Sequence, residues 1–227
     1  MRRHVATGLL MAVLLTGCAA ERQVWGAPIP VATTSAADPA ADAAGIRSTF
    51  ERYRAALLAR NGAALPPLVS PGTISHYDHV VRLAQTAGPA EIAGAGIMDR
   101  IMIARLRVEM PAEQLATIDG AGLLVYGVDE GMIDASSVEG NGLGNVRVDG
   151  DRGFAEMLLG SEPSGVEWEF VRVGPDWTFD LVAGFPLINN TLAQTAAESG
   201  MTEDEFVFEA VSLVTGLPVD ATVFSAP

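Results

Sequence analysis

Four short segments in which apolar and polar residues alternate lie in the second half of the chain. Alternation with a period of two is typical of a strand with one buried face, and the Gly-, Pro- and Asp-containing stretches between the segments are typical of turns. We therefore predict a four-stranded antiparallel sheet. Its strands are expected at 142–148, 153–159, 166–173 and 177–183.

The apolar pattern also predicts how these strands pair, because a slip of one residue would turn every side chain to the opposite face. The expected partners are Arg172 with Trp177, Phe170 with Phe179, Leu159 with Val166, and Val148 with Gly153. This register gathers the apolar side chains on one face, which we expect helices to cover. That face comprises Val146, Val148, Ala155, Met157, Leu159, Val166, Trp168, Phe170, Trp177, Phe179 and Leu181.

The opposite face carries a row of three carboxylates in the same register, formed by Glu156, Glu169 and Asp180. Like charges on neighbouring strands destabilise a sheet. One interpretation is a solvated outer face on which water screens the charges. The other is a site for a cation or a polar ligand, or a carboxylate pair that shares a proton.

Helices are predicted before the sheet. Apolar residues recur at helical spacing from Ile46 to Leu57. Ser70-Pro71 then combines an N-cap with a proline at the first helical position, and residues 90–109 form a further, strongly apolar helix. Residues 119–132 fit a helix or a strand, and we favour a helix.

Two helices are predicted after the sheet. The first spans 186–199, and the second begins at Thr202, which forms a capping box with Glu205 and ends at Gly216. The fold class is therefore α+β, with N-terminal helices, an antiparallel sheet and two C-terminal helices. We expect a single domain at 45–217, and a tail at 218–227.

The N-terminus has the features of an export signal. It begins with Arg2-Arg3, continues with an apolar run too short to span a bilayer, and ends in Leu15-Thr16-Gly17-Cys18. Cys18 is the only cysteine, so it has no disulfide partner within the chain. This arrangement resembles the lipobox of bacterial lipoproteins. The alternative is an ordinary signal peptide with a chance cysteine.

The lipobox resemblance implies that residues 1–17 are a signal peptide and that Cys18 becomes lipidated through palmitate-type acyl chains. It implies a location in the bacterial cell envelope. We expect attachment to the outer membrane where the organism has one, because Ala19 and not an aspartate follows the cysteine. Otherwise we expect attachment to the outer face of the plasma membrane. Residues 18–44 are rich in Ala, Pro, Thr and Ser and are expected to form a flexible tether.

The charge of the chain excludes some partners. Its 14 basic residues are all arginine and face 28 acidic ones, which gives a net charge of −14. Nucleic-acid binding needs a basic surface, and an anionic membrane repels an acidic protein. We therefore expect no nucleic-acid partner, and membrane contact only through lipidated Cys18.

Few residues suggest a metal or a cofactor. His76 and His79 share one face of a predicted helix, with Asp78 between them, but a zinc site needs three or four ligands. We expect the two histidines to be surface or boundary residues. The glycines of 140–144 precede a strand, which favours a bulge or a turn over a phosphate loop. No nucleophile elbow, P-loop or dinucleotide motif is present, so we expect no metal and no cofactor.

Two hairpins carry a family resemblance. One spans 146–152, and the other, at 169–181, contains Phe170-x-Arg172, a turn, and Trp177-x-x-Asp180-Leu181. With the helices before them, they resemble the nuclear transport factor 2-like superfamily in its bacterial secreted branch, over roughly 45–183. The resemblance implies a cystatin-like cone, in which helices close over a curved sheet. The long helical stretch at 89–132 and the two helices after the sheet depart from that pattern.

That superfamily includes ketosteroid isomerases, polyketide cyclases, epoxide hydrolases and non-catalytic binding domains. We expect a non-catalytic cone that binds an apolar small molecule or an envelope protein. Two alternatives remain: an isomerase- or cyclase-type enzyme, and a structural assembly subunit that uses its exposed sheet face. The enzyme would need a carboxylate or tyrosine in the pocket, and the candidates are Asp99, Tyr77, Tyr53 and Asp180. The expected pocket residues are Tyr53, Tyr77, Trp168, Phe170, Trp177 and Phe179.

Overall fold

Helix α1 (Pro39–Leu58) begins where the sequence offers an N-cap and a proline for the first turn. The Asp38 carboxylate accepts hydrogen bonds from the backbone N–H groups of Ala40 and Ala41, which have no partner within the helix. The structure, a computed structural model, describes residues 38–133, 135 and 138–226. Residues 38–44, expected in the tether, thus belong to the folded part. Cys18, the leader and the rest of the tether lie outside the described residues.

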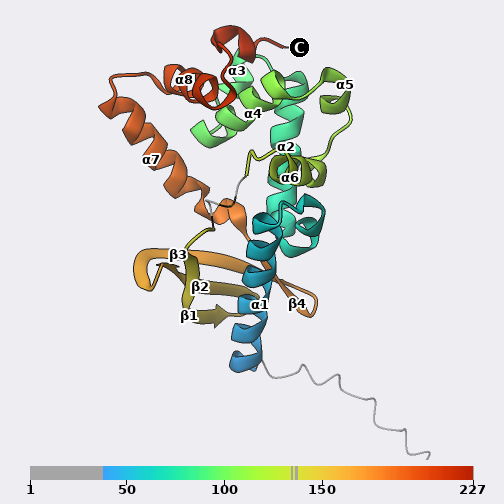
Figure 1. The fold of residues 1–227 in the computed structure, drawn as a ribbon, viewed down its shortest axis with the longest axis vertical. Coiled ribbons are helices and arrows are strands. Elements are labelled where there is room, and N and C mark those ends of the chain that lie inside the picture. Colours follow the sequence, from blue (N-terminus) through green and yellow to red (C-terminus); the bar gives the residue numbers. More distant parts are fainter. Residues whose placement is uncertain (1–37, 134, 136–137, 227) are drawn as a thin grey trace, which may run out of the picture. The chain divides into compact units, whose positions relative to one another are not determined.

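The predicted order of helices, antiparallel sheet and helices is confirmed (Figure 1). The helices after α1 and before the sheet are α2 (Pro71–Thr86), α3 (Pro89–Ile92), α4 (Ile97–Glu109), α5 (Ala112–Leu115) and α6 (Gly120–Asp129), with short 3-10 turns η1 (Gly62–Ala64) and η2 (Pro66–Leu68). After the sheet come η4 (Leu181–Gly184), α7 (Phe185–Glu198), α8 (Glu203–Thr215) and η5 (Ala221–Phe224).

The four strands are β1 (Asn141–Asp149), β2 (Arg152–Leu159), β3 (Glu162–Val173) and β4 (Asp176–Phe179). They form an open antiparallel sheet in the order β1-β2-β3-β4. The β1–β2 register shifts between Leu143 and Val146, so the bulge predicted from the glycines is confirmed. At Gly144 a Cβ atom would overlap the Glu156 carboxylate, which explains the glycine there.

One part of the predicted register is wrong. The pairs at β1–β2 and β3–β4 are confirmed, but Leu159 pairs with Glu162, and Ala155 pairs with Trp168. The β2–β3 turn is shorter than the glycine-rich segment suggested, so the partners move by four residues next to the turn and by two beyond an irregularity between Glu156 and Leu158. Both shifts are even and therefore keep the faces of the strands, but Leu159, beside the turn, is 56% exposed and not buried.

Two predicted boundaries are also wrong. The helix expected at 90–109 is divided, because α3 ends at Ile92 and α4 begins only at Ile97. The fourth strand, expected to reach residue 183, ends at Phe179. Beyond it, Asp180 accepts hydrogen bonds from the hydroxyls of Ser70 (3.0 Å) and Thr73 (3.3 Å), which draws the chain toward the start of α2. The helix favoured at 119–132 is confirmed as α6.

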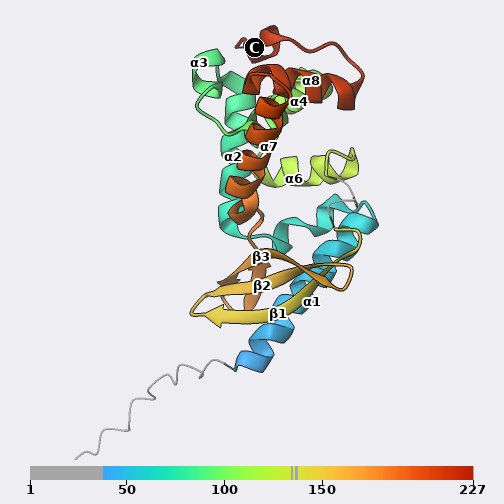
Figure 2. The same cartoon turned by 90° about the vertical axis from the view of Figure 1, so that its left-hand side faces the viewer.

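Helix α1 covers the apolar face of the sheet (Figures 1 and 2). Ile46 and Phe50 are fully buried there, and the Phe50 ring meets the edge of Phe179 with a 6.2 Å centroid separation. The contact is close because Gly45 and Gly153 leave room for neighbouring side chains: a Cβ on Gly45 would lie 2.9 Å from Trp177. The first predicted helix therefore packs on the sheet.

A polar clamp fixes the start of α1 to β3 and β4. Arg172 pairs with Asp42 at 2.6 Å, and its guanidinium lies 4.3 Å from the centre of the Trp177 ring. The Trp177 indole N–H also donates to Asp42 at 3.3 Å. The hydrogen bond from Arg172 lowers the pKa of Asp42 from its ordinary value, and Trp177 adds to this effect.

The remaining helices pack together around α2. Helix α6 approaches α2 at Gly120, where a Cβ atom would lie 2.5 Å from the Ile74 carbonyl oxygen. The Asp78 carboxylate accepts the Gly120 N–H at 2.6 Å and so satisfies the N-terminus of α6. A glycine is thus required for this contact between helices.

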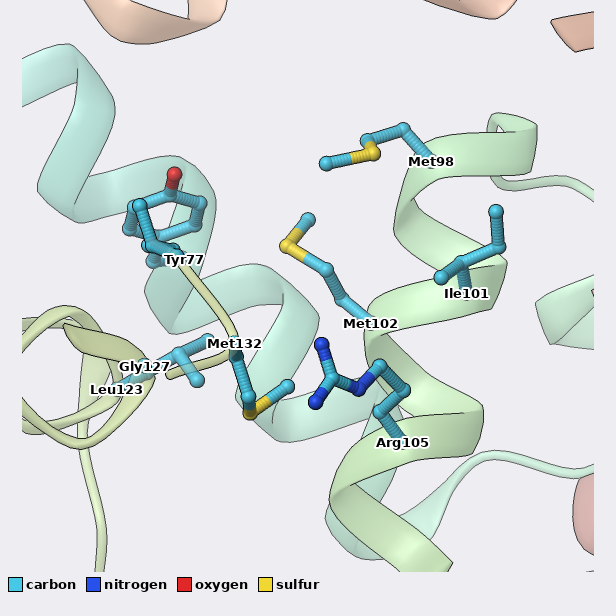
Figure 3. Close-up of a pocket in the computed structure, with 9 residues that line it drawn as sticks. Tyr77, Met98, Ile101, Met102, Arg105, Leu123, Gly127 and Met132 are labelled. Carbon is cyan, nitrogen blue, oxygen red and sulfur yellow. The ribbon is translucent and has the colours of Figure 1, made fainter. Parts of the chain in front are cut away.

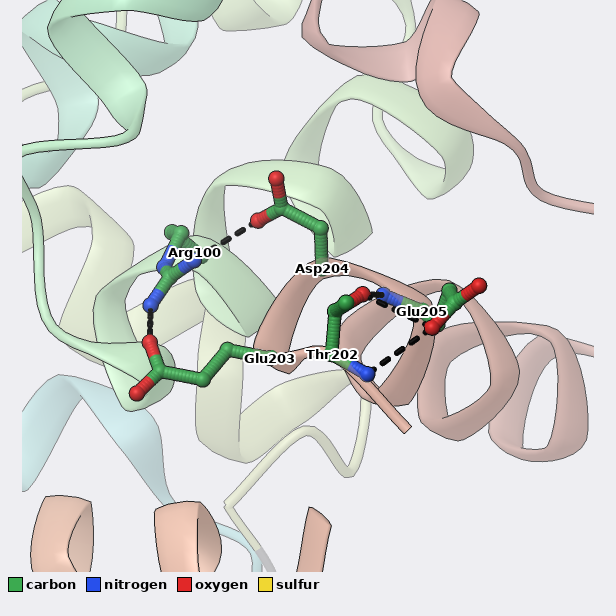
Figure 4. A network of polar contacts seen from close by, with 5 residues as sticks. All are labelled: Arg100, Thr202, Glu203, Asp204 and Glu205. Atoms are coloured by element: carbon green, nitrogen blue, oxygen red, sulfur yellow. Dashed lines mark hydrogen bonds and ion pairs between the residues drawn. The ribbon is translucent and has the colours of Figure 1, made fainter. Parts of the chain in front are cut away.

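Helix α8 attaches to α4 by polar contacts (Figure 4). Arg100 of α4, whose side chain is buried, pairs with Asp204 at 2.6 Å and with Glu203, both in the first turn of α8. The predicted capping box of Thr202 and Glu205 is confirmed beside them. Carboxylates at a helix N-terminus also interact favourably with the helix dipole.

The segment expected to be a C-terminal tail is part of the fold. It contains η5, in which Phe224 is buried and lies 5.1 Å from Phe208 of α8. Arg107 of α4 donates to the carbonyl oxygens of Val223 (3.0 Å) and Ser225 (2.9 Å). Among the described residues, no helix is long and apolar enough to cross a bilayer.

Candidate functional site

A pocket lies among α2, α4, α6 and the residues that follow α6 (Figure 3). Its volume is about 80 Å³, enough for a few water molecules or a small organic molecule. Its wall is mostly apolar. The lining residues are Tyr77, Met98, Ile101, Met102, Arg105, Leu123, Gly127, Met132 and Ile133.

The pocket follows from how its helices begin. Ser70 caps α2 by accepting the Thr73 N–H at 3.0 Å, which places Tyr77 two turns into the helix. Asn189 of α7 accepts the Met98 N–H at 2.9 Å and so supplies the side-chain partner that Gly96, the N-cap of α4, lacks. Met98, Ile101, Met102 and Arg105 then lie on one face of α4 by their spacing of three and four residues.

Three methionines give the wall its character. Met98 and Met102 come from α4, and Met132 comes from the other side of the pocket (Figure 3). A methionine side chain is unbranched and polarisable, so it adapts to ligands of different shapes. The wall is therefore suited to an apolar body whose outline need not be fixed.

Tyr77 is the polar group of the wall on α2. The residue is 4% exposed, and burial raises the pKa of its phenol well above the ordinary value, with a smaller contribution from the Asp99 charge. The phenol therefore keeps its proton at physiological pH. No residue in the described part of the chain hydrogen-bonds to its hydroxyl. In Figure 3 the hydroxyl points toward the end of the pocket where Met98 lies.

Arg105 is the charged group of the wall. Its Nε donates to Glu109 at 2.8 Å and its Nη2 donates to the same carboxylate at 3.2 Å. This two-point pair within α4 compensates the arginine charge at the pocket. The pocket therefore offers no uncompensated charge to a ligand.

A histidine–carboxylate pair lies beside the pocket. His76 Nε2 and Asp99 Oδ1 are 2.9 Å apart, and the His76 ring meets Phe185 edge-on with a 5.2 Å centroid separation. Both residues are sequence neighbours of wall residues, Tyr77 and Met98, but neither lines the pocket. His79 is exposed. No group of three His, Cys, Asp or Glu side chains able to hold a metal occurs within the residues that the structure describes.

Of the six residues expected to line a pocket, only Tyr77 lines this one. Four of the others pack against each other: Phe179 stacks on Phe170 with centroids 4.9 Å apart and meets Tyr53 and Trp168 edge-on at 5.0 and 5.1 Å. Trp177 belongs to the clamp with Asp42. These rings form the core between α1 and the sheet, because α1 lies close enough to leave them in mutual contact.

The predicted carboxylate row is not formed. The two-residue shift of β3 places Glu167 opposite Glu156, and Phe154 opposite Glu169. Glu169 pairs with Arg152, and Glu167 lies 3.3 Å from Arg147. Asp180 is bonded to Ser70 and Thr73 at the junction of the sheet with α2. Glu169 and Asp180 thus have separate partners, whereas Glu156 faces Glu167 across the β2–β3 pair, and the described residues contain no group of three carboxylates able to hold a metal ion.

Sequence reasoning overlooked the methionines and Arg105. The available signal was the spacing of Met98, Ile101, Met102 and Arg105, which places them on one helical face. That signal does not distinguish a pocket wall from a packed core, because both consist of apolar residues at helical spacing. The space remains open because α6 and residues 131–133 do not pack fully against this face of α4.

No protein-family profile, curated protein or solved structure matches the chain significantly. The function must therefore be argued from the geometry and chemistry of this pocket and from the N-terminal motif.

Proposed function

We propose that this chain is a lipid-anchored envelope protein whose folded domain binds a small, largely apolar molecule in the pocket among α2, α4 and α6. The observation that carries the proposal is the apolar, methionine-rich wall around about 80 Å³ of space. An apolar wall favours apolar molecules over water. A mostly apolar lining with few polar groups is also a feature of the larger pockets that bind drug-sized ligands.

Binding fits the pocket better than catalysis does. A general acid or base must reach the reacting atom, directly or through one water molecule. Of the residues considered for catalysis, only Tyr77 lines the pocket, and its raised pKa keeps it protonated. Asp99 is bonded to His76, Asp180 to Ser70 and Thr73, and Tyr53 lies in the aromatic core.

The membrane anchor rests on Leu15-Thr16-Gly17-Cys18. Lipidation explains an unpaired cysteine directly after an export signal, and more than one acyl chain gives stable attachment. The nuclear transport factor 2-like cone remains part of the proposal: α1 covers the apolar face of the sheet, as a cone requires, although the binding pocket proposed here lies among the other helices.

The pocket is tested by nuclear magnetic resonance on the full chain carrying Cys18→Ser, which cannot be acylated at this position. With ¹³C-methyl methionine, toluene should shift the Met98, Met102 and Met132 methyl signals saturably. The methyl of Met110, buried outside the pocket, serves as the internal control. Met102→Phe should fill the space and abolish the response, whereas Met201→Phe should leave it. Unshifted pocket methyls would refute the proposed binding function.

The anchor is tested in cells grown with radiolabelled palmitate. The wild-type chain should incorporate label and sediment with membranes, and Cys18→Ser should do neither. Ala19→Ser, the matched control, changes the neighbouring residue and keeps the cysteine. Membrane attachment that survives in Cys18→Ser would contradict the anchor.

A second candidate, binding of a protein partner, is supported by exposed apolar residues at the end of α8. Leu213 and Val214 are 83% and 62% exposed, and Leu217 follows at 49%. Such exposure on neighbouring residues is typical of interaction surfaces. Replacement of Leu213 by Ser would weaken the binding of a protein partner. It would leave the response of the methionine methyl signals to toluene unchanged.

A further inference from the structure

We infer that the ligand of the helical pocket is an uncharged, mostly apolar molecule with one oxygen acceptor, and that the Tyr77 hydroxyl donates a hydrogen bond to that oxygen. This inference rests on the proposed binding function and specifies its ligand class. It depends on three features of the wall: a hydroxyl on a buried tyrosine that lacks a described partner, a compensated charge and an apolar remainder.

The first feature is the Tyr77 hydroxyl. The Tyr77 side chain is buried, but its hydroxyl lies at the open space of the pocket, where water can reach it. A ligand that fills the pocket displaces this water and must offer the hydroxyl a partner, because a hydroxyl buried without a hydrogen bond is unfavourable. None of the described residues bonds to this hydroxyl, and the phenol remains protonated, since burial and the nearby Asp99 carboxylate both oppose its ionisation. Its O–H can therefore donate to an oxygen acceptor on the ligand.

The second feature is the absence of net charge in the wall. Arg105 is the charged residue of the lining, and Glu109 holds it through two hydrogen bonds. A carboxylate ligand would have to compete with Glu109 for the guanidinium and would lose its own hydration in an apolar pocket. An amine would also lose its hydration, and the described lining offers it no carboxylate. An uncharged ligand avoids both penalties.

The third feature is the apolar remainder, which includes Met98, Met102, Met132 and Ile133. It offers the rest of the ligand no hydrogen-bonding group, so further polar groups on the ligand would be buried without partners. Ketones, ethers and esters with a compact hydrocarbon body fit these conditions. Polyols, sugars and amino acids do not fit them.

The test compares three probes on the Cys18→Ser chain, followed by the methionine methyl signals. Cyclohexanone has one acceptor oxygen, toluene has none, and cyclohexanecarboxylate adds a charge. Tyr77→Phe removes only the hydroxyl. It should weaken cyclohexanone binding about tenfold, the effect of losing one buried hydrogen bond, and leave toluene binding within about twofold.

Tyr53→Phe is the matched control, because Tyr53 is equally buried but lies in the aromatic core. It should change neither affinity. The inference would be overturned if cyclohexanone bound equally well to the chain with Tyr77 and to the chain with Tyr77→Phe. It would also be overturned if cyclohexanecarboxylate bound more tightly than cyclohexanone. In both cases a toluene response would leave the proposed pocket standing. Failure of all three probes to shift the pocket methyls would refute the pocket itself.

Discussion

Asp42 has two roles at the scale of a single residue. It lies in the first turn of α1, where a carboxylate favours the helix, and it also joins α1 to Arg172 and Trp177. The helix pattern indicates only the first role. The second depends on β4, 135 positions further along the chain, and no local signal in the sequence shows it.

The lowered pKa of Asp42 predicts a pH dependence of stability. A carboxylate whose pKa is lower in the folded state stabilises the fold above its unfolded pKa, and this contribution disappears as the pH falls through the folded pKa. Asp42→Asn should therefore have a lower free energy of unfolding than wild type at pH 7. This difference in free energy, the stability gap, should narrow below about pH 4. Urea denaturation at pH 7, 5 and 3 measures the gap.

Asp38→Asn is the control for this prediction, because Asp38 caps the same helix without contacting Arg172, and asparagine caps equally well. It should show no comparable gap at any of the three pH values. If the stability gap between Asp42→Asn and wild type stayed constant from pH 7 to pH 3, the ionised Asp42 carboxylate would not be the source of the stabilisation.

At the scale of elements, glycines decide how closely the helices approach. Helix α6 begins Gly120-Ala121-Gly122, a composition unfavourable for a helix, and this made the sequence ambiguous between helix and strand. The structure explains Gly120, because the backbone of α2 occupies the place of a Cβ atom. Tertiary packing thus outweighs a weak helical propensity.

Replacement of Gly120 tests this contact. Gly120→Ala raises helix propensity, but its methyl group would lie 2.5 Å from the Ile74 carbonyl oxygen and from the Asp78 nitrogen. We expect the free energy of unfolding to fall by about 1–3 kcal/mol. Gly72→Ala is the control, since its methyl would come no closer than 3.5 Å to another atom, and it should be neutral or stabilising by up to about 1 kcal/mol. If Gly120→Ala were more stable than wild type, the predicted requirement for a glycine would be wrong, because α6 could then move away from α2.

At the scale of the folded part as a whole, Arg107 connects three segments. From α4 it donates to Leu83, Ala84 and Ala87 at the end of α2, and to Val223 and Ser225 near the C-terminus. All five N–H groups of the guanidinium are used in this way. The carbonyl oxygen of Leu83 also accepts the Ala87 N–H (3.0 Å), so Arg107 adds a second hydrogen bond there and supplies partners for the carbonyl oxygens of Ala84 and Ala87 at the end of the helix.

Arg107→Lys should lower the free energy of unfolding by about 2–4 kcal/mol. Lysine keeps the charge but offers only three donors from one point, so it cannot reach both sets of carbonyls. Arg52→Lys, on the exposed side of α1, should change stability by no more than about 0.5 kcal/mol. Equal effects of the two substitutions in urea denaturation would refute this role of Arg107.

The helices and strands were largely predictable, because caps, glycine stops and apolar periodicity act within a few residues. Ser70-Pro71, the Thr202–Glu205 capping box and Gly216 each mark a boundary that the structure confirms. The same information failed at the β2–β3 turn and at the end of β4. At the β2–β3 turn, Leu159 pairs with Glu162 across only two residues, whereas the glycines of 160–165 suggested a longer turn. The end of β4 depends on a distant contact, that of Asp180 with Ser70.

The candidate site was only partly predictable. Tyr77 was among the expected pocket residues, but the five others proved to be core or clamp, and the methionines were overlooked. By itself, the sequence determined the α+β class, the order of the elements and the apolar sheet face, since these depend on local propensity and on alternation. Only the tertiary structure decided where space remains, because α1 fills the sheet face while α2, α4 and α6 leave a gap. Whether apolar residues form a core or a pocket depends on the distance between elements, which no local pattern records.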